Sequence, residues 1–287
     1  MKTQTTISRL SAALLALALG TGSALAVDGT WVTNATGGNW DATGKWVSNI
    51  IPGGVGSTAD FQVSRTSSNI NVALNGDRTV GILKLGFFSS SRGLNLTASS
   101  KLILDNGAND AQINFRDGGG NTSINPDATE LRSNLLINHL DDGNDKWVFF
   151  TSGLSSTNGH LTITNTSHPA SRTKFNGVVS DGTAGNSITY NQTAGWSEFT
   201  NNSNTFTGTT TNGGGLLNLG NTAGISLALQ NSALNTTGSI AGTTTVGLRL
   251  FAGINSLTLG GLIGDKHFAA TGGVFSTASA NYNLVTP

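Results

Sequence analysis

Short apolar strands separated by turn residues are the feature that most limits what this chain can fold into. The pattern is clearest in residues 204–221, NTFTGTTTNGGGLLNLGN, where a threonine-rich segment leads into three glycines and then into a strand in which Leu217 and Leu219 flank Asn218. β-Branched residues favour an extended backbone, and Gly213–Gly215 permit a turn with positive φ. This segment is therefore predicted to form a strand, a tight turn and a second strand.

Similar short strands recur from Asn69 onward at intervals of roughly 8 to 12 residues, with clusters of Gly, Asn, Asp and Ser between them. Asn121–Ala128 and Asp141–Asp145 are expected to be excursions from this array, and no amphipathic helix is predicted. The predicted strands are Ile70–Leu74, Val80–Leu85, Leu94–Leu96, Leu102–Leu104, Ile113–Phe115, Leu135–Ile137, Trp147–Phe149, Leu161–Ile163, Phe175–Val179, Ile188–Tyr190, Phe206–Thr210, Leu216–Leu219, Ile225–Leu229, Leu248–Phe251 and Leu257–Leu259.

This spacing suits a sandwich or barrel as well as a β-solenoid. Two features favour the solenoid. Many strands have only three alternating positions, as in Leu94–Leu96, which suits the small faces of a coil. Several strands also place Asn beside Leu, and stacked coils align such residues into hydrogen-bonded ladders. The predicted fold is all-β, a right-handed parallel β-helix (β-solenoid), with a β-sandwich as the alternative.

The composition agrees with a repetitive β architecture. Charged residues make up 10% of the chain, against about 25% in ordinary globular domains. A hydrophobic content of 37% with regular alternation favours packed strands over disorder. Because the chain contains no cysteine, its stability must come from packing and main-chain hydrogen bonds.

The first residues have the form of a signal peptide. Lys2 and Arg9 supply positive charge, residues 10–19 are apolar, and Ala24-Leu-Ala26 is a small-residue cleavage site. Since a membrane-spanning helix needs about 20 apolar residues, this segment is predicted to be a signal peptide (residues 1–26) that is cleaved after Ala26. The mature chain is expected to have no transmembrane segment, to pass through export machinery, and to be secreted or held at the cell surface.

Residues 27–61 differ from the rest of the chain because they contain Trp31, Trp40 and Trp46 and end in the turn and strand PGGVGSTADF. The first coil of a solenoid has an uncovered end, which a cap of indole rings would cover. An exposed platform that stacks on sugars is the alternative, but large aromatic residues are mostly well buried. We expect a Trp-rich N-terminal cap with a buried core, followed by the solenoid in residues 62–287.

Residues 204–221 resemble the autotransporter-associated β-strand repeat of secreted passenger domains, which begins N-T-[YF]-T-G-x-T-T and ends G-x-L-x-L-G-N. The Trp-rich opening and residues 232–264 also resemble what precedes and follows that repeat. The resemblance implies an exported β-helical passenger, suited to adhesion or matrix interaction. Such a protein ends in a membrane barrel, for which the residues after Gly264 are too few and too polar. We therefore expect a truncated chain, a freely secreted relative or another export route.

The sequence contains no G-x-S-x-G or H-E-x-x-H motif, and neither Gly44-Lys45-Trp46 nor the GGGN at residues 118–121 matches a phosphate-binding, dinucleotide or calcium-repeat motif. The strongest metal or acid–base candidate is an acidic cluster with a neighbouring histidine and lysine. β-Helical polysaccharide lyases use aspartates with calcium and a basic residue, although three acids in one turn are usually only solvated. The candidate residues are His139, Asp141, Asp142, Asp145 and Lys146.

The other titratable residues have simpler interpretations. His160, His168 and His267 lie far apart in the sequence and are predicted to be surface or turn residues. Arg116-Asp117 and Arg172–Lys174 are predicted to be exposed turn charges. We assign no catalytic, cofactor-binding or metal-binding residue and expect no cofactor.

The leading hypothesis is an exported, non-enzymatic β-helical passenger or structural surface protein with a role in adhesion or matrix interaction. Its expected partner is a polysaccharide or another surface ligand. The alternatives are a β-helical polysaccharide lyase or hydrolase, and a carbohydrate-binding module that uses the N-terminal tryptophans. Nucleic-acid binding is not expected, because 15 basic residues balance 15 acidic ones and leave no positive field.

Overall fold

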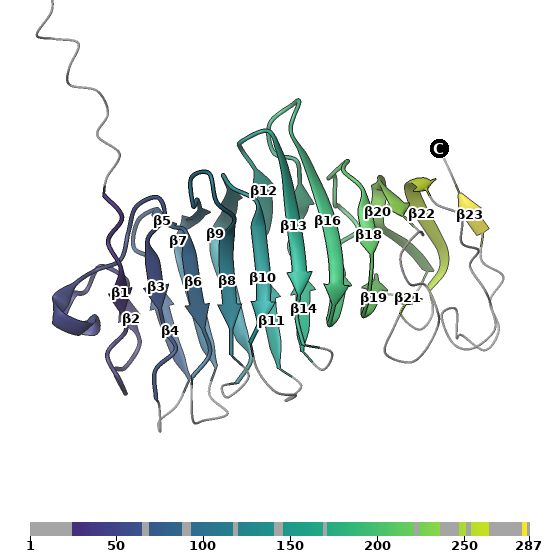
Figure 1. Cartoon of the computed structure of the whole chain (residues 1–287). Helices are drawn as coiled ribbons and strands as arrows, with labels where there is room; N and C mark the ends of the chain where they lie inside the picture. The colour runs from purple at the N-terminus through teal and green to yellow at the C-terminus, as the bar shows by residue number, and fades with distance from the viewer. Residues whose placement is uncertain are drawn as a thin grey trace, which may run out of the picture.

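The chain is a stack of parallel β-coils. The computed structural model describes residues 25–64, 69–87, 93–116, 120–140, 146–168, 171–220, 224–235, 247–250, 254–263 and 283–285, so residues 1–24 of the predicted signal peptide lie outside the described residues. Figure 1 shows the strands side by side along one axis, with β1 and β23 at opposite ends of the first sheet. The predicted parallel β-solenoid is confirmed. The β-sandwich is wrong, because the named strands pair in parallel with strands of the next coil and not in antiparallel hairpins.

The first sheet faces the viewer in Figure 1 and contributes one strand to each coil. In the described ranges its order is β1 (Gly29–Thr30), β3 (Thr58–Asp60), β6 (Ile82–Leu85), β8 (Ala111–Phe115), β10 (Leu135–His139), β13 (His160–Thr166), β16 (Ser187–Ala194), β18 (Thr210–Asn212), β20 (Gly224–Asn235), β22 (Ile254–Ile263) and β23 (Asn283–Val285). This order follows the chain, so each coil lies directly on the preceding one.

The second sheet is bent. Its main path is β2 (Gly38–Asn39), β4 (Ile70–Ala73), β7 (Leu94–Leu104), β9 (Thr122–Leu131), β11 (Trp147–Phe150), β14 (Arg172–Phe175), β17 (Trp196–Phe199), β19 (Leu216–Leu219) and β21 (Gly247–Leu250). The strands β5 (Arg78–Val80), β12 (Gly153–Ser156) and β15 (Val179–Ser180) continue it beyond the bend. The long strands β7 and β9 belong to both parts of this sheet. The first residues of β7 pair with β4 and its last residues with β5. The first residues of β9 pair with β11 and its last residues with β12.

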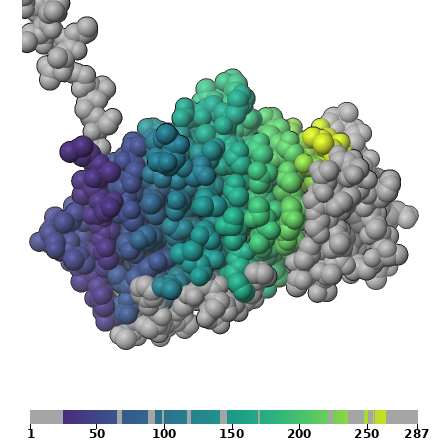
Figure 2. All heavy atoms as spheres, viewed as in Figure 1, coloured from purple at the N-terminus to yellow at the C-terminus, as the bar shows by residue number. Residues whose placement is uncertain are grey.

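The coils differ in length while the ladders stay in register. Tyr190 lies opposite Thr210, 20 residues on, whereas Leu83 lies opposite Ile113, 30 residues on. Part of the difference lies in the intervening strand of the second sheet, since β7 has 11 residues and β17 has 4. Figure 2 shows the outcome as bands of colour that follow one another along the stack.

Inside the solenoid, residues of one kind lie above one another. In the second sheet three phenylalanines form the inner phenylalanine stack, Phe150, Phe175 and Phe199, which are buried and in register. The ring of Phe175 is stacked at 5.0 Å from Phe150 and 4.7 Å from Phe199, measured between centroids. This spacing is close to the distance of about 4.8 Å between neighbouring strands. Parallel coils in register are therefore what allows the rings to stack.

The predicted polar ladders are present on the outer face. Asn95 Nδ2 donates to Asn71 Oδ1 of the preceding coil at 2.9 Å. Asn218 Nδ2 donates to Glu198 Oε1 of the preceding coil at 3.0 Å. The asparagine next to the leucines thus links one coil to the next.

Asn121–Ala128 is not an excursion, and that prediction was wrong. Residues 122–131 form β9, which pairs with strands on both sides. The misleading residue was Pro126, which lacks an N–H for a ladder. It lies opposite Ala98, where the strand bends and the pairing with β7 shifts register, and such irregular positions tolerate proline. Asp141–Asp145, the other predicted excursion, lies outside the described residues.

Two predicted strands are displaced. Phe175 ends β14 and Val179 begins β15, so Phe175–Val179 is a turn between strands. A Cβ on Gly177 would overlap the Ser152 carbonyl oxygen, so the turn needs glycine there. Thr210 begins β18, whereas Phe206 lies before that strand and packs against Phe199 at 5.8 Å.

One glycine of the GGG turn is predicted to be irreplaceable. Gly215 has a φ of 75°, and a Cβ there would overlap the Gly195 carbonyl oxygen. Gly215→Ala is therefore expected to cost about 1–2 kcal/mol from the backbone conformation alone, and the overlap adds to this. Gly44→Ala is the control, because a Cβ on Gly44 meets open space. Urea unfolding should show a lower midpoint for Gly215→Ala than for Gly44→Ala, and equal midpoints would contradict the prediction.

Among the described residues, no helix is long and apolar enough to cross a membrane.

Candidate functional site

The tryptophans of the N-terminal cap are buried. Trp31, Trp40 and Trp46 are at most 1% exposed, and the Trp46 ring lies 4.9 Å from Trp31 and 5.3 Å from both Trp40 and Phe61. Trp40 Nε1 donates to the Pro52 carbonyl at 3.1 Å. The predicted buried core of the cap is confirmed. The alternative of a sugar-stacking platform on these tryptophans is wrong, because their faces are covered by each other and by Phe61.

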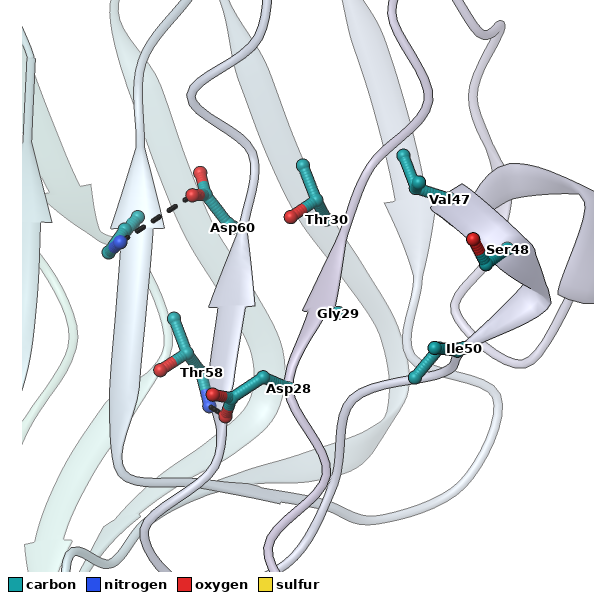
Figure 3. A pocket seen from close by; sticks show the side chains of 9 residues that line it. Asp28, Gly29, Thr30, Val47, Ser48, Ile50, Thr58 and Asp60 are labelled. Carbon is teal, nitrogen blue, oxygen red and sulfur yellow. Dashed lines mark hydrogen bonds and ion pairs between the residues drawn. The ribbon is translucent and has the colours of Figure 1, made fainter.

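A pocket of about 310 Å³ lies on the outside of the cap, between β1 and the 3₁₀ helix η2 (Val47–Asn49) (Figure 3). A first 3₁₀ helix, η1 (Thr43–Lys45), precedes η2 in the chain. Its lining is Asp28, Gly29, Thr30, Val47, Ser48, Ile50, Thr58, Asp60 and Lys84. Asp28 Oδ1 accepts from the Thr58 N–H at 2.6 Å, and Asp60 lies 3.6 Å from Lys84 Nζ. Both carboxylates therefore link neighbouring strands, which connects the cap to the first coils.

The histidine of the predicted acidic candidate is buried. The ring of His139 lies inside the solenoid, 4% exposed, at 4.9 Å from Phe115, and its Nε2 lies 3.4 Å from Thr173 Oγ1. His139 ends β10, whose alternate residues face inward. Asp141, Asp142 and Asp145 lie outside the described residues.

The described members of the other predicted polar groups are His160, His168 and Arg116. His160 is exposed at the start of β13, where its Nδ1 lies 2.8 Å from Ser187 Oγ, and His168 lies in a turn. Asp117 and His267 are outside the described ranges. Within those ranges, no group of three or more His, Cys, Asp or Glu side chains could hold a metal ion.

The most distinctive outer surface lies on the second sheet. Five strands align as WVFF, RTKF, WSEF, LLNL and GLRL in β11, β14, β17, β19 and β21. The second and fourth residues point inward and are buried, so the first and third point outward. The resulting outer aromatic–basic face consists of Trp147, Phe149, Arg172, Lys174, Trp196 and Arg249.

Arg172 lies against two indoles whose ring centroids are 6.3 Å apart. Its guanidinium carbon lies 3.6 Å from the centroid of Trp196 and 4.6 Å from that of Trp147. Trp147 also stacks on Phe149 at 5.5 Å with an interplanar angle of 6°. Arg249 approaches Trp196 to 5.8 Å. Cations over aromatic faces are attracted by the ring quadrupole, so these side chains are fixed relative to one another.

Basic charge exceeds acidic charge on this face. Glu198 is the single acidic residue among the outward positions of the five described strands, and its side chain is 4% exposed. It lies 3.3 Å from Lys174 Nζ and accepts from Asn218 at 3.0 Å. Glu198 therefore offsets Lys174.

The prediction that Arg172–Lys174 are turn charges was wrong, because both residues belong to β14. Sequence reasoning also missed Trp196 as a site residue. The signal in the sequence was the phenylalanine at the fourth position of each tetrapeptide, WVFF, RTKF and WSEF. Aligning these tetrapeptides would have placed both outer tryptophans on either side of Arg172.

A second polar group lies in the interior, between the two sheets. Asn165, Tyr190 and Ser197 are fully buried. Asn165 Nδ2 donates to Ser197 Oγ at 2.7 Å and lies 3.3 Å from the Tyr190 hydroxyl, and Asn165 Oδ1 accepts from Ser167 Oγ. This inner polar cluster (Asn165, Ser167, Tyr190 and Ser197) takes the place of aliphatic residues, since Asn165 lies opposite Ile137.

Stability is predicted to fall at high pH because of this cluster. Burial raises the pKa of Tyr190 to about 12, although hydrogen bonds to Ser197 and Asn165 lower it in part. In an unfolded chain the tyrosine hydroxyl loses its proton near pH 10. The stability that the neutral, buried Tyr190 contributes is therefore complete below about pH 10 and is lost between about pH 10 and 12. The loss should reach about 2–3 kcal/mol. Urea unfolding at several pH values should show this slope, and Tyr190→Phe should lack it; identical slopes would contradict the assignment.

A scan against protein-family models and searches against curated proteins and solved structures found no match. The fold and the sites define a capped parallel β-solenoid with an aromatic and basic outer face.

Proposed function

We propose that this chain is an exported, non-enzymatic β-solenoid of the autotransporter-passenger type that acts as a structural or adhesive scaffold at the cell surface. The observation that supports this most strongly is the uninterrupted stack of parallel coils, which is covered at its N-terminal end by buried tryptophans. A stack of this kind presents long outer faces on a rigid axis, which suits contact with an extended polymer.

The cap supports the same proposal. An open first coil would expose unpaired backbone groups to other chains. Here Val27 and Gly53 exchange backbone hydrogen bonds at 3.0 Å, and the Val32 N–H donates to the Lys45 carbonyl at 2.8 Å. The segment from Thr43 to Gly53 therefore covers the free edge of β1 and favours a soluble rod over edge-to-edge association.

Export is tested with the full chain in the cell that makes it. Fractionation, N-terminal sequencing and digestion of intact cells by an external protease should give a chain that starts at Val27 and lies outside the cell. A chain that starts at Met1 and stays protected from the protease would overturn the proposal of export.

The non-enzymatic role is tested separately on the purified protein. A panel of neutral and acidic glycans is assayed for both binding and cleavage, since a β-helical lyase or hydrolase would shorten its substrate. Binding without any change in chain length supports a scaffold. Turnover of any glycan in the panel would overturn it in favour of an enzyme.

A further inference from the structure

We propose that Asn75–Gly76, in the turn that joins β4 to β5, is a site of spontaneous deamidation in the folded chain. In this reaction the Gly76 nitrogen attacks the Asn75 side-chain amide and forms a cyclic imide, which water then opens. Asn75 would become aspartate or isoaspartate at the contact between the N-terminal cap and the first coil. This inference does not depend on the proposed surface function.

The sequence contains five Asn–Gly pairs, and the structure describes all of them: residues 75–76, 106–107, 158–159, 176–177 and 212–213. Glycine has no side chain that hinders the approach of its nitrogen to the preceding side chain, so these pairs are the points of the chain most prone to cyclise. A folded chain resists the reaction where the asparagine amide and the glycine N–H are held in place. The hydrogen-bond partners of each pair therefore decide how fast it reacts.

Four of the pairs are fixed to the backbone. In each of them the asparagine amide or the glycine N–H donates to a main-chain carbonyl. These bonds run from Asn106 Nδ2 to Asp110, from Asn158 Nδ2 to Arg132, from the Gly177 N–H to Phe150 and from the Gly213 N–H to Gln192, at 2.7, 2.8, 3.1 and 2.7 Å. Cyclisation at these pairs would first have to break a hydrogen bond to the main chain.

Asn75–Gly76 differs because its two reacting groups are held by side chains. Asn75 Nδ2 donates to Asp41 Oδ2 at 2.6 Å, and the Gly76 N–H donates to Ser100 Oγ at 2.9 Å. Asn75 and Gly76 are both exposed, and the Asp41 side chain is 42% exposed. Exposed side chains change rotamer within nanoseconds. These two hydrogen bonds therefore restrain the pair less than a bond to the main chain does.

Arg78 favours the reactive form of this peptide group. Its Nη2 donates to the Asn75 carbonyl at 2.7 Å, and a Cβ on Gly76 would lie 3.7 Å from the same nitrogen. The Asn75 carbonyl and the Gly76 nitrogen belong to one peptide unit, so a proton lost from the nitrogen leaves a negative charge that resonance shares with this oxygen. A guanidinium at that oxygen stabilises the charge and raises the population of the attacking anion.

The reaction exchanges ammonia for water and needs no oxidant or reductant. The Gly76 nitrogen loses its proton to water by way of Ser100 Oγ and forms a bond to Asn75 Cγ. The bond between Cγ and Nδ2 breaks, and Nδ2 takes up a proton from water beside Asp41 and leaves as ammonia. Water then opens the imide. Cleavage of the bond from the Gly76 nitrogen to Cγ gives aspartate, and cleavage of its bond to the main-chain carbon gives isoaspartate.

The product would weaken the link between the cap and the first coil. Asp41 lies in the cap, one residue after the buried Trp40, and Asn75 follows β4. A carboxylate at position 75 cannot donate to Asp41 and repels it. Isoaspartate also lengthens the backbone of the turn by one atom. Deamidation is therefore expected to loosen the attachment of the cap as the folded chain ages.

The test is peptide mapping by mass spectrometry of the folded mature chain, incubated at neutral pH beside the same chain in guanidinium chloride. In the folded chain, deamidation of Asn75 is expected to be at least tenfold faster than that of the other four asparagines. In the denatured chain this difference should disappear. Equal rates at the five pairs of the folded chain, or a faster reaction at another pair, would overturn the inference.

Hydroxylamine gives a second readout, because it cleaves the chain at cyclic imides. It should cut the folded chain between residues 75 and 76, and the cut should vanish in Asn75→Ala. A cut of the folded chain elsewhere, or one that persists in Asn75→Ala, would contradict the proposed site.

Arg78→Gln separates assistance from restraint. It is expected to slow the deamidation of Asn75 at least threefold, because the positive charge at the Asn75 carbonyl is lost. If the guanidinium only held the turn rigid, its removal would speed the reaction, so a faster or unchanged rate would overturn the role of Arg78. Arg132→Gln is the charge-matched control, since the Arg132 side chain is 45% exposed and pairs with Glu130 at 2.7 Å. It should leave the rate at Asn75 unchanged, and thermal unfolding of each variant confirms that it is folded.

Discussion

Phe175→Ala is expected to destabilise the solenoid by about 3–5 kcal/mol, the usual cost of emptying a phenylalanine site in a packed core. Phe175 is fully buried and stands in the middle of the inner phenylalanine stack, 5.0 Å from Phe150 and 4.7 Å from Phe199, with the Tyr190 ring edge-on at 5.8 Å. Because its neighbours belong to fixed ladders above and below, they have little freedom to close the cavity. Urea unfolding monitored by far-UV circular dichroism measures the loss.

Phe149→Ala is the matched control. Phe149 has the same side chain and lies beside Phe150 in β11, but it points outward and stacks on Trp147. Its removal creates no internal cavity, so a loss below about 1 kcal/mol is expected. If the two substitutions lowered the unfolding midpoint equally, the assignment of inward and outward positions in the second sheet would be wrong.

Trp46→Ala is expected to release the N-terminal cap. Trp46 contacts Trp31, Trp40 and Phe61, and its Nε1 donates to the Trp40 carbonyl at 2.5 Å. Replacing it removes a fully buried side chain and a hydrogen bond, at a cost of about 3–5 kcal/mol. Since each coil contacts only its neighbours, the effect should be local and not spread along the stack.

Hydrogen exchange distinguishes a local from a global effect. In Trp46→Ala the amides of β1 and β3 should lose protection, whereas those of β13 and β16 should keep it. The first coil should then associate with other chains through its uncovered edge, seen as concentration-dependent light scattering. Val47→Ala, at a neighbouring side chain that is 49% exposed, should do neither. Uniform loss of protection in Trp46→Ala would show that the cap and the later coils unfold as one unit.

The sequence was sufficient for the fold class and for the cap. Alternating leucines such as Leu94 and Leu96, followed by turn residues, require short strands with one buried side. Trp31, Trp40 and Trp46 lie too close together in the chain to be spread over several coils. Both features are local, and local patterns determine which residues are buried.

The outer aromatic–basic face could not be predicted in the same way. Its residues come from β11, β14, β17 and β21, and their contacts depend on which coil lies on which. Because coil length varies from the 20 residues between Tyr190 and Thr210 to the 34 between Gly38 and Val72, spacing alone does not identify neighbours. β14 is also polar at three of its four positions, RTKF. Sequence reasoning therefore took Arg172 for a turn residue, whereas it begins β14 and lies against the rings of Trp147 and Trp196.

The inner polar cluster has a consequence for how the coils find their partners. Coils that all present aliphatic residues inward could stack one step out of place at little cost. Asn165 donates to Ser197 across the two sheets. If β19 took the place of β17, Leu217 would stand where Ser197 is and would offer Asn165 no hydrogen bond, at a penalty of about 1–3 kcal/mol for each buried polar group left without a partner. A few hydroxyl and amide groups in a mostly apolar interior thus select the correct pairing of coils. They penalise misaligned assembly without contributing much to the stability of the folded solenoid.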